Sequence, residues 1–200
     1  MSSTNAHATF WQWFQSNLDR FDRFEDEREE LMDELSEQLH EVDENLVYEI
    51  SSDKSAAREL IISADGIRES FPAVIKLVES APDLSGWKIT PFRPRVDVEQ
   101  FRLEFDEREY SASDFYFWLQ SDEEHIDLIL YVPGLAADNR NQLVNICYIL
   151  LDMAIGEYDV TTKIRYIDHQ PLAPDPKADG LKPLTELPVE FDRLCAAQRK

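Results

Sequence analysis

The sequence predicts an α+β fold in which a long N-terminal amphipathic helix precedes two ββαβ units, which form a predominantly antiparallel sheet with helices on one face. Apolar residues recur at helical spacing near the N-terminus, and the order strand, strand, helix, strand then occurs twice. A chain of 200 residues with 43% hydrophobic content can bury one sizeable core. We therefore expect a single domain over 1–200, with a helical segment at 1–44, ββαβ units at 45–95 and 96–169, and a Pro-rich loop with a short C-terminal helix at 170–200.

The N-terminal segment from about residue 9 to 42 fits one or two amphipathic helices. Its apolar side chains recur at steps of three and four residues: Phe14, Leu18, Phe21, Phe24, Leu31, Met32, Leu35, Leu39 and Val42. Seven carboxylates lie on the opposite side of a helical wheel: Asp26, Glu29, Glu30, Asp33, Glu37, Glu41 and Glu44. Because several of them form like-charge pairs four residues apart, with no lysine to relieve them, we expect an exposed acidic face.

The first ββαβ unit is predicted from alternating apolar residues and turn signals. The stretches "NLVYEIS" and "RELIISA" are typical of a hairpin around the polar bend "SDKSAA". A helix follows from about Gly66 to Ser80. The segment "GWKITPFRP" supplies an extended strand, closed by prolines that cannot continue a central strand.

The second unit repeats this order. A hairpin of "SDFYFWLQ" and "IDLILYVP" precedes the helix "ADNRNQLVNICYILLDMAIG", which Gly156 ends, and "YDVTTKIRYID" alternates like a strand. A short amphipathic stretch, "DVEQFRLEFDE", connects the units. The loop "QPLAPDPKADGLKP" leads to a closing helix, "TELPVEFDRLCAAQ".

The aromatic clusters "FWQWF" and "DFYFWL" are either core or a binding platform. Their spacing favours core and helix-docking positions, which we expect for Trp11, Phe14, Phe115, Phe117 and Trp118.

The net charge of −21 and the pI near 4.4 exclude two classes of partner. Nucleic acids and anionic membrane surfaces would be repelled, whereas a basic protein would be attracted. The N-terminus has no secretory signal, the longest apolar run is too short to span a membrane, and the two cysteines suit a reducing compartment. We expect a cytoplasmic protein.

No catalytic, cofactor or metal site is predicted. Glu37 and His40 have the Glu-x-x-His spacing of a carboxylate-bridged metal site, but no second copy exists and the pair lies on the outer side of the helix. His125 sits among acids in "SDEEH" without the pattern of a calcium loop. Five glycines form no phosphate-binding loop, Cys147 lies in an apolar helix without a neighbouring histidine in the sequence, and Cys195 lies near the C-terminal end. The sequence therefore leans against an enzyme.

At "FWQWFQ", "ELIISADGIRESFPAV", "GWKITPFRPR" and "LLDMAIGEYDVTTKI" the chain resembles a group of uncharacterised bacterial cytosolic proteins with no known activity. The resemblance spreads over most of the chain. It implies a bacterial cytosolic protein and carries no mechanism or functional residue.

Two functional hypotheses follow. The first is a non-enzymatic acidic protein that acts by protein-protein association, immunity-like or inhibitory toward a basic partner, through the seven carboxylates. The acidic face could instead serve solubility alone or reflect an acidic proteome. The second hypothesis is a small-ligand-binding protein or enzyme with a pocket between the helical layer and the sheet, lined by Arg93, Arg95, Tyr158 and Asp159. The two arginines would clamp a carboxylate there, or pair with the protein's own acids.

Overall fold

The computed structural model describes residues 3–22, 28–51, 57–105, 108–122 and 125–198. The chain forms two compact units, which we call unit 1 (Met1–Arg93) and unit 2 (Pro94–Lys200), and each buries its own apolar cluster. The sequence analysis expected a single domain around one core. The buried apolar residues form one cluster in each unit, where helices pack against strands.

Unit 1 begins with three helices: α1 (Ser3–Ser16), α2 (Leu18–Asp22) and α3 (Arg28–His40). The predicted apolar stripe is confirmed on α3, where Leu31, Leu35 and Leu39 recur every four residues and are fully buried. Phe14 of α1 joins them in the core, with its ring centroid 4.8 Å from that of Phe21. The leading segment therefore folds as separate helices, with residues 23–27, including Phe24, outside the described part.

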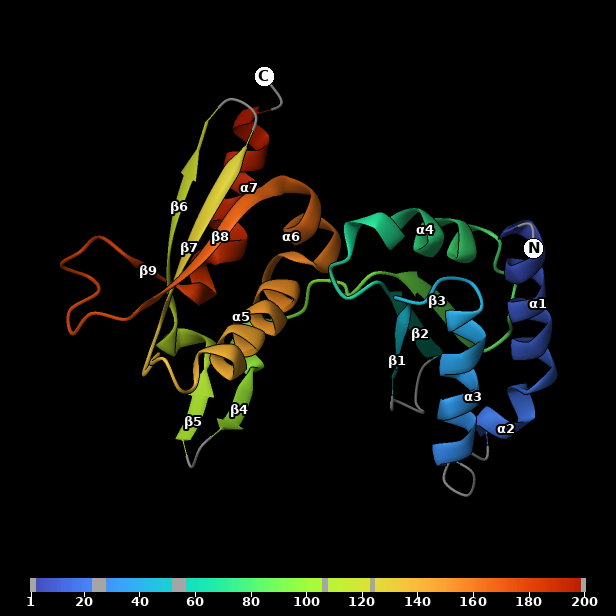
Figure 1. Cartoon of the computed structure of the whole chain (residues 1–200). Helices are drawn as coiled ribbons and strands as arrows, with labels where there is room; N and C mark the ends of the chain where they lie inside the picture. The colour runs from blue at the N-terminus through green and yellow to red at the C-terminus, as the bar shows by residue number, and fades with distance from the viewer. Residues whose placement is uncertain (1–2, 23–27, 52–56, 106–107, 123–124, 199–200) are drawn as a thin grey trace. The chain divides into compact units, whose positions relative to one another are not determined.

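The sheet of unit 1 has the order β1-β2-β3, shown with α4 in Figure 1. Its strands are β1 (Val47–Ile50), β2 (Arg58–Ser63) and β3 (Trp87–Pro91). β1 and β2 pair antiparallel, whereas β2 and β3 pair in parallel. The parallel connection carries the short 3-10 helix η1 (Arg68–Ser70) and α4 (Phe71–Glu79).

Unit 2 contains a two-stranded and a four-stranded sheet. The first pairs β4 (Arg102–Phe105) with β5 (Arg108–Ser111). The second has the order β8-β7-β6-β9: β8 (Ile164–Pro171), β7 (Ile126–Val132), β6 (Tyr116–Ser121) and β9 (Lys182–Pro183). β7 pairs antiparallel with β6 and parallel with β8. Short 3-10 helices join these elements: η2 (Val98–Gln100), η3 (Ala112–Asp114) and η4 (Leu184–Glu186).

Three helices cover one side of the four-stranded sheet (Figure 1). They are α5 (Arg140–Ile155), α6 (Glu157–Lys163) and α7 (Leu187–Gln198). Alternate residues of β7 are buried beneath them: Ile126, Leu128, Leu130 and Val132. Because side chains alternate along a strand, the other residues of β7 belong to the opposite face.

The described residues therefore form a mixed α/β fold with seven α-helices and nine strands, in which antiparallel pairing dominates and helices stand at the N-terminus. The strands make three sheets rather than the single sheet that the sequence predicted. No helix in the described ranges has the length and apolar character needed to cross a bilayer.

Two segments differ from the sequence prediction. "DVEQFRLEFDE" contributes η2 and β4 instead of a simple connection. The first half of "YDVTTKIRYID" is the helix α6, and β8 begins only at Ile164. Val160 of α6 is buried in the core of unit 2, and the Thr162 hydroxyl donates to the Tyr158 carbonyl oxygen at 2.6 Å. Core packing thus overrides the strand preference of this β-branched run.

Candidate functional site

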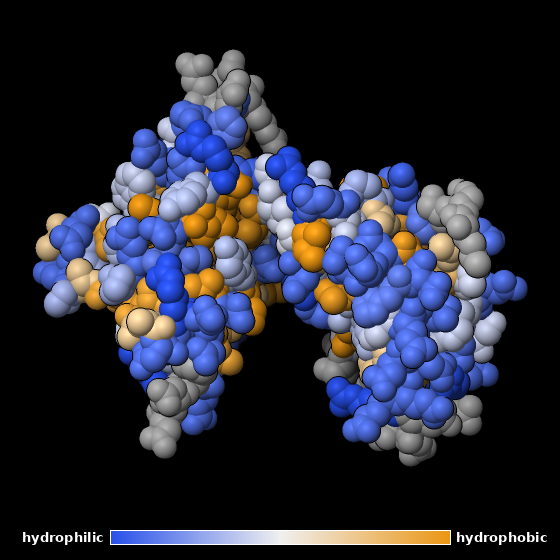
Figure 2. All heavy atoms as spheres, viewed as in Figure 1, coloured by the Kyte–Doolittle hydropathy of each residue, from blue (hydrophilic) through white to orange (hydrophobic). Residues whose placement is uncertain are grey.

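The acidic face is exposed, as the sequence predicted. Six of its seven members are exposed in the structure: Glu29, Glu30, Asp33, Glu37, Glu41 and Glu44. Asp26 lies outside the described residues. The surface over α3 is mostly hydrophilic in Figure 2. We keep the name "acidic face" for these six side chains.

Within the described chain, no lysine or arginine forms an ion pair with the acidic face. Glu34, on another side of α3, shows the contrast, because it is held by Arg20 of α2. That guanidinium donates to both carboxylate oxygens, at 2.7 and 2.9 Å, and these bonds hold the pKa of Glu34 below its usual value. The chain therefore compensates a carboxylate beside the face and leaves the face itself uncompensated.

Glu37 and His40 belong to no group of three or more metal-ligating side chains among the described residues. Both side chains are exposed on α3. No group of three or more His, Cys, Asp or Glu side chains able to hold a metal ion occurs among the described residues. A pair of exposed ligands on one helix is too few to define a coordination site.

The four residues of the predicted ligand pocket are divided between the two units. Arg93 belongs to unit 1, where it pairs with Glu49 (2.6 Å) and Asp65 (2.9 Å). Arg95, Tyr158 and Asp159 belong to unit 2.

Arg95 is engaged by the protein's own groups. Its guanidinium donates to the Ile155 carbonyl oxygen at 2.7 Å and pairs with Asp192 of α7 (2.7 Å) and Asp159 of α6 (2.9 Å). It also lies over the Phe191 ring, with its central carbon 5.6 Å from the ring centroid. Tyr158 is 45% exposed. Arg95 thus joins α6 to α7 through contacts with the protein's own groups.

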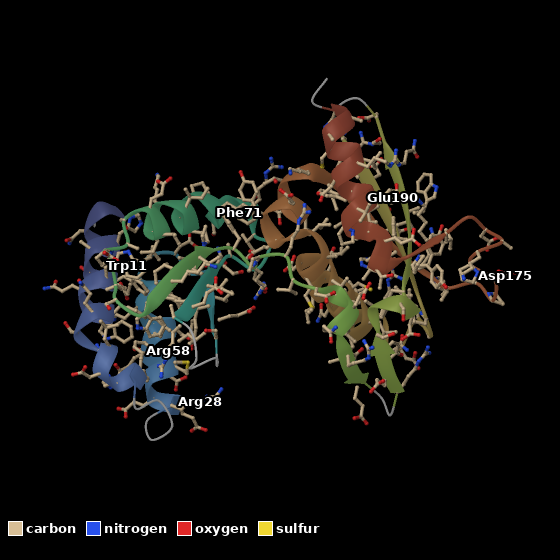
Figure 3. All side chains as sticks on the ribbon, turned by 180° about the vertical axis from the view of Figure 1, so that it is seen from behind. Trp11, Arg28, Arg58, Phe71, Asp175 and Glu190 are labelled. Carbon is tan, nitrogen blue, oxygen red and sulfur yellow. The ribbon has the colours of Figure 1, made fainter. Side chains whose placement is uncertain are left out.

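Two depressions on the surface of the described residues bear on a candidate site. The larger, of about 430 Å³, lies in unit 1 against α1 and the end of α4, and is lined by His7, Ala8, Trp11, Gln12, Gln15, Ser80 and Pro82. Trp11, seen in Figure 3, donates its indole N–H to the Leu77 carbonyl oxygen at 2.9 Å. Burial, with a contribution from Lys76, lowers the pKa of His7. The depression therefore combines a neutral imidazole with amides and contains no nucleophile beyond a serine hydroxyl.

The smaller depression, of about 140 Å³, lies in unit 2 beside β6 and α7. Glu190 of α7, labelled in Figure 3, pairs there with Lys182 (2.5 Å) and Arg193 (2.8 Å). Because these three charged side chains pair with one another, we interpret them as a structural ion-pair network.

Two buried side chains with reactive atoms are core residues. Burial raises the pKa of the Cys147 thiol to about 12, which removes its nucleophilic thiolate at neutral pH. His169 on β8 is 6% exposed, and its Nε2 is the one buried side-chain nitrogen or oxygen without a hydrogen-bond partner among the described residues. Its ring lies 5.5 Å from that of Tyr148, and it lines neither depression.

The structure also exposes a feature that sequence reasoning missed. Phe115 and Phe117 are buried as predicted, but Trp118 is 39% exposed, so its predicted core position is wrong. Trp118 alternates with Phe117 along β6, so its side chain belongs to the face of the sheet opposite the helices. The alternation of side chains along the strand "YFWLQ" could have indicated that Trp118 faces away from Phe117. The sequence does not show this alternation as a pattern of apolar and polar residues, because all five residues are large.

Comparisons with known proteins add no relative: no protein family model, no curated protein and no solved structure was found to match this chain.

Proposed function

We propose that this chain is a non-enzymatic acidic protein that acts by association with a basic protein, and that the acidic face of α3 is the contact surface. The observation that carries the proposal is the exposure of four carboxylates on α3 (Glu29, Glu30, Asp33 and Glu37) and of Glu41 and Glu44 shortly after it, none with a cationic partner in the described chain. An immunity-like or inhibitory role, in which the acidic face covers a basic active surface of a nuclease or similar protein, is its most concrete form.

The physical support is electrostatic. The carboxylates Glu29, Asp33, Glu37 and Glu41 follow one another every four residues, and each like-charge pair costs a few tenths of a kcal/mol at low salt, so about 1 kcal/mol together. A basic partner would convert this repulsion into attraction. The field around the acidic face would also speed encounter with a cationic protein and oppose nucleic acids.

We infer a bacterial cytoplasmic setting for this association. It is supported by the resemblance noted above and by the two free cysteines, Cys147 and Cys195. We also propose that the two units share one ββαβ plan. In support, each contains an antiparallel strand pair, then a helical connection, then a strand that pairs in parallel with the second.

The alternative, a ligand-binding pocket around Arg93, Arg95, Tyr158 and Asp159, has less support. Both arginines are already bound by carboxylates of their own unit. Release of Arg93 would remove the cation that pairs with Glu49 and Asp65, and release of Arg95 would remove the cation that pairs with Asp192.

The test is capture from a bacterial cytosolic extract at about 50 mM salt, followed by affinity measurement on the identified partner. The triple variant Glu30→Lys, Asp33→Lys and Glu37→Lys should weaken binding at least about tenfold. The matched control Glu99→Lys, Asp138→Lys and Asp179→Lys makes the same charge change at exposed positions of unit 2. Equal losses in the two variants would mean that total charge, and not the acidic face, determines binding. Unchanged binding in the α3 variant would refute the proposal.

A further inference from the structure

The face of the four-stranded sheet opposite the helices carries a row of aromatic residues. Strand register places nine side chains there, in three rows across β6, β7 and β8: Gln120, Asp127 and Tyr166; Trp118, Ile129 and Asp168; Tyr116, Tyr131 and Gln170. We call these nine residues the open face. Trp118 and Tyr166 are its most exposed rings, at 39% and 56%. Four aromatic rings therefore lie together on one side of a small sheet, and such a grouping is typical of a binding surface, unlike apolar residues scattered singly.

The rings of the open face are not used by the chain itself. None of Tyr116, Trp118, Tyr131 and Tyr166 takes part in a ring contact or a cation-π contact with another described residue. Elsewhere the chain does stack its arginines on rings. The clearest example is Arg108, whose central guanidinium carbon lies 4.7 Å from the centroid of Tyr110. The open face therefore presents rings on which a guanidinium could stack, and no described arginine or lysine is stacked on them.

Carboxylates accompany these rings. Asp127 is bound by Arg165, whose Nε lies 2.9 Å from Oδ1. Asp168 accepts hydrogen bonds from the Gln170 amide (3.1 Å) and the His169 backbone N–H (2.8 Å), but forms no ion pair among the described residues. These hydrogen bonds lower the pKa of Asp168, so it is ionised at neutral pH. The Asp168 carboxylate on the open face thus has no ion-pair partner among the described residues.

Charge decides which occupant suits this face. Unit 2 has 11 basic and 21 acidic side chains, a net charge of −10. An anionic strand such as single-stranded nucleic acid would be repelled, although it is the usual ligand of aromatic sheet faces. A second copy of the chain would bring two negative units together. An arginine side chain suits both the exposed rings and the Asp168 carboxylate of this face, because its planar guanidinium stacks on a ring and pairs with a carboxylate.

The dimensions suit an extended chain. Trp118 and Asp168 lie in one row two strands apart, which is about 10 Å at the usual strand spacing. An extended peptide presents alternate side chains about 7 Å apart on one side. Two long arginine side chains at alternate positions can therefore reach Trp118 and Asp168 together.

We propose that the open face of unit 2 is a docking surface for an extended, arginine-bearing segment of a partner protein. This surface is distinct from the acidic face of α3, and the proposal does not depend on the function proposed above.

The test uses the full chain and a synthetic peptide with arginine at alternate positions. Trp118 is the one tryptophan in unit 2, so its indole N–H signal in an NMR titration reports on the open face. The peptide should shift this signal and leave those of Trp11, Trp13 and Trp87 in place. Replacing arginine by citrulline, which keeps the shape and removes the charge, should weaken binding about tenfold.

Variants locate the binding surface. Trp118→Ala combined with Tyr166→Ala should weaken binding about tenfold. If this double variant does not fold, Tyr166→Ala alone serves as the test: the position is 56% exposed, and the substitution should weaken binding several-fold. The control Ile149→Ala truncates a 52% exposed apolar residue of α5 and should change affinity less than about twofold. The α3 triple variant should bind the peptide normally, which separates this result from the test of the acidic face.

Three outcomes would overturn the proposal. The first is equal binding of the arginine and citrulline peptides. The second is self-association of the chain that Trp118→Ala abolishes, which would assign the open face to a second copy. The third is a Trp118 shift caused by neutral oligosaccharides and not by the arginine peptide, which would make the open face a sugar-binding surface.

Discussion

Arg20 and Glu34 form a two-point ion pair between α2 and α3, with Nη1 to Oε2 at 2.7 Å and Nη2 to Oε1 at 2.9 Å. The Arg20 guanidinium also donates to the Asn17 side-chain oxygen at 2.9 Å. Both charged side chains are partly buried, at 24% and 32% exposure. The pair ties α3 to the turn before α2 and orients the helix whose outer side carries the acidic face.

We predict that Glu34→Gln lowers the free energy of unfolding by about 1 kcal/mol at pH 7, because it removes a well-aligned but partly exposed ion pair. The pKa of Glu34 is lowered in the folded state, so its contribution is complete above the unfolded pKa and disappears as the pH falls through the folded value. Urea unfolding between pH 7 and pH 3 measures this. Glu37→Gln, one turn away and exposed, is the control, and an equal loss there would contradict the assignment.

Relief of the acidic face should stabilise α3. Asp33→Lys converts two like-charge pairs, with Glu29 and Glu37, into opposite-charge pairs and should raise the free energy of unfolding by about 1 kcal/mol at low salt. The gain should shrink in about 0.5 M salt, because exposed charges are screened. Urea titrations at the two salt concentrations test this. A gain independent of salt would point to helix propensity instead.

The two separate cores predict separate effects of core truncation. Leu35→Ala removes a fully buried side chain from unit 1 and should cost about 2 to 5 kcal/mol. Amide hydrogen exchange should accelerate in β2 and α4 but not in β7 and α5. Leu130→Ala in unit 2 should give the reverse pattern. Loss of protection throughout the chain after either substitution would show that the units unfold together.

The buried His169 should make the free energy of unfolding of unit 2 depend on pH. Burial lowers its pKa, repulsion from Arg140 lowers it further, and Asp168 partly opposes both. As the pH falls, His169 is protonated in the unfolded state at a higher pH than in the folded state. Its full contribution to the free energy of unfolding is therefore present above the ordinary histidine pKa of about 6.5 and is lost as the pH drops below that value. An NMR titration should place the His169 midpoint below the ordinary histidine value of about 6.5. His169→Leu should flatten the dependence between pH 7 and pH 5, and an unchanged slope would rule His169 out as its source.

The sequence by itself determined features that depend on neighbours along the chain. Leu31, Leu35 and Leu39 face the core because a helix repeats every 3.6 residues, and the carboxylates between them face outward for the same reason. The end of α5 at Gly156 is equally local, because a backbone φ of 85° favours glycine. These features follow from periodicity and backbone sterics alone.

Tertiary structure decided the rest. The segment "YDVTTKIRYID" begins as a helix because Val160 is buried in the core of unit 2. No local sequence pattern encodes this burial. The division into two cores depends on which helices close over which sheet. The exposure of Trp118 depends on strand register and on the side of the sheet that α5 and α7 cover, because a large residue on a strand is equally suited to either face until one face is buried.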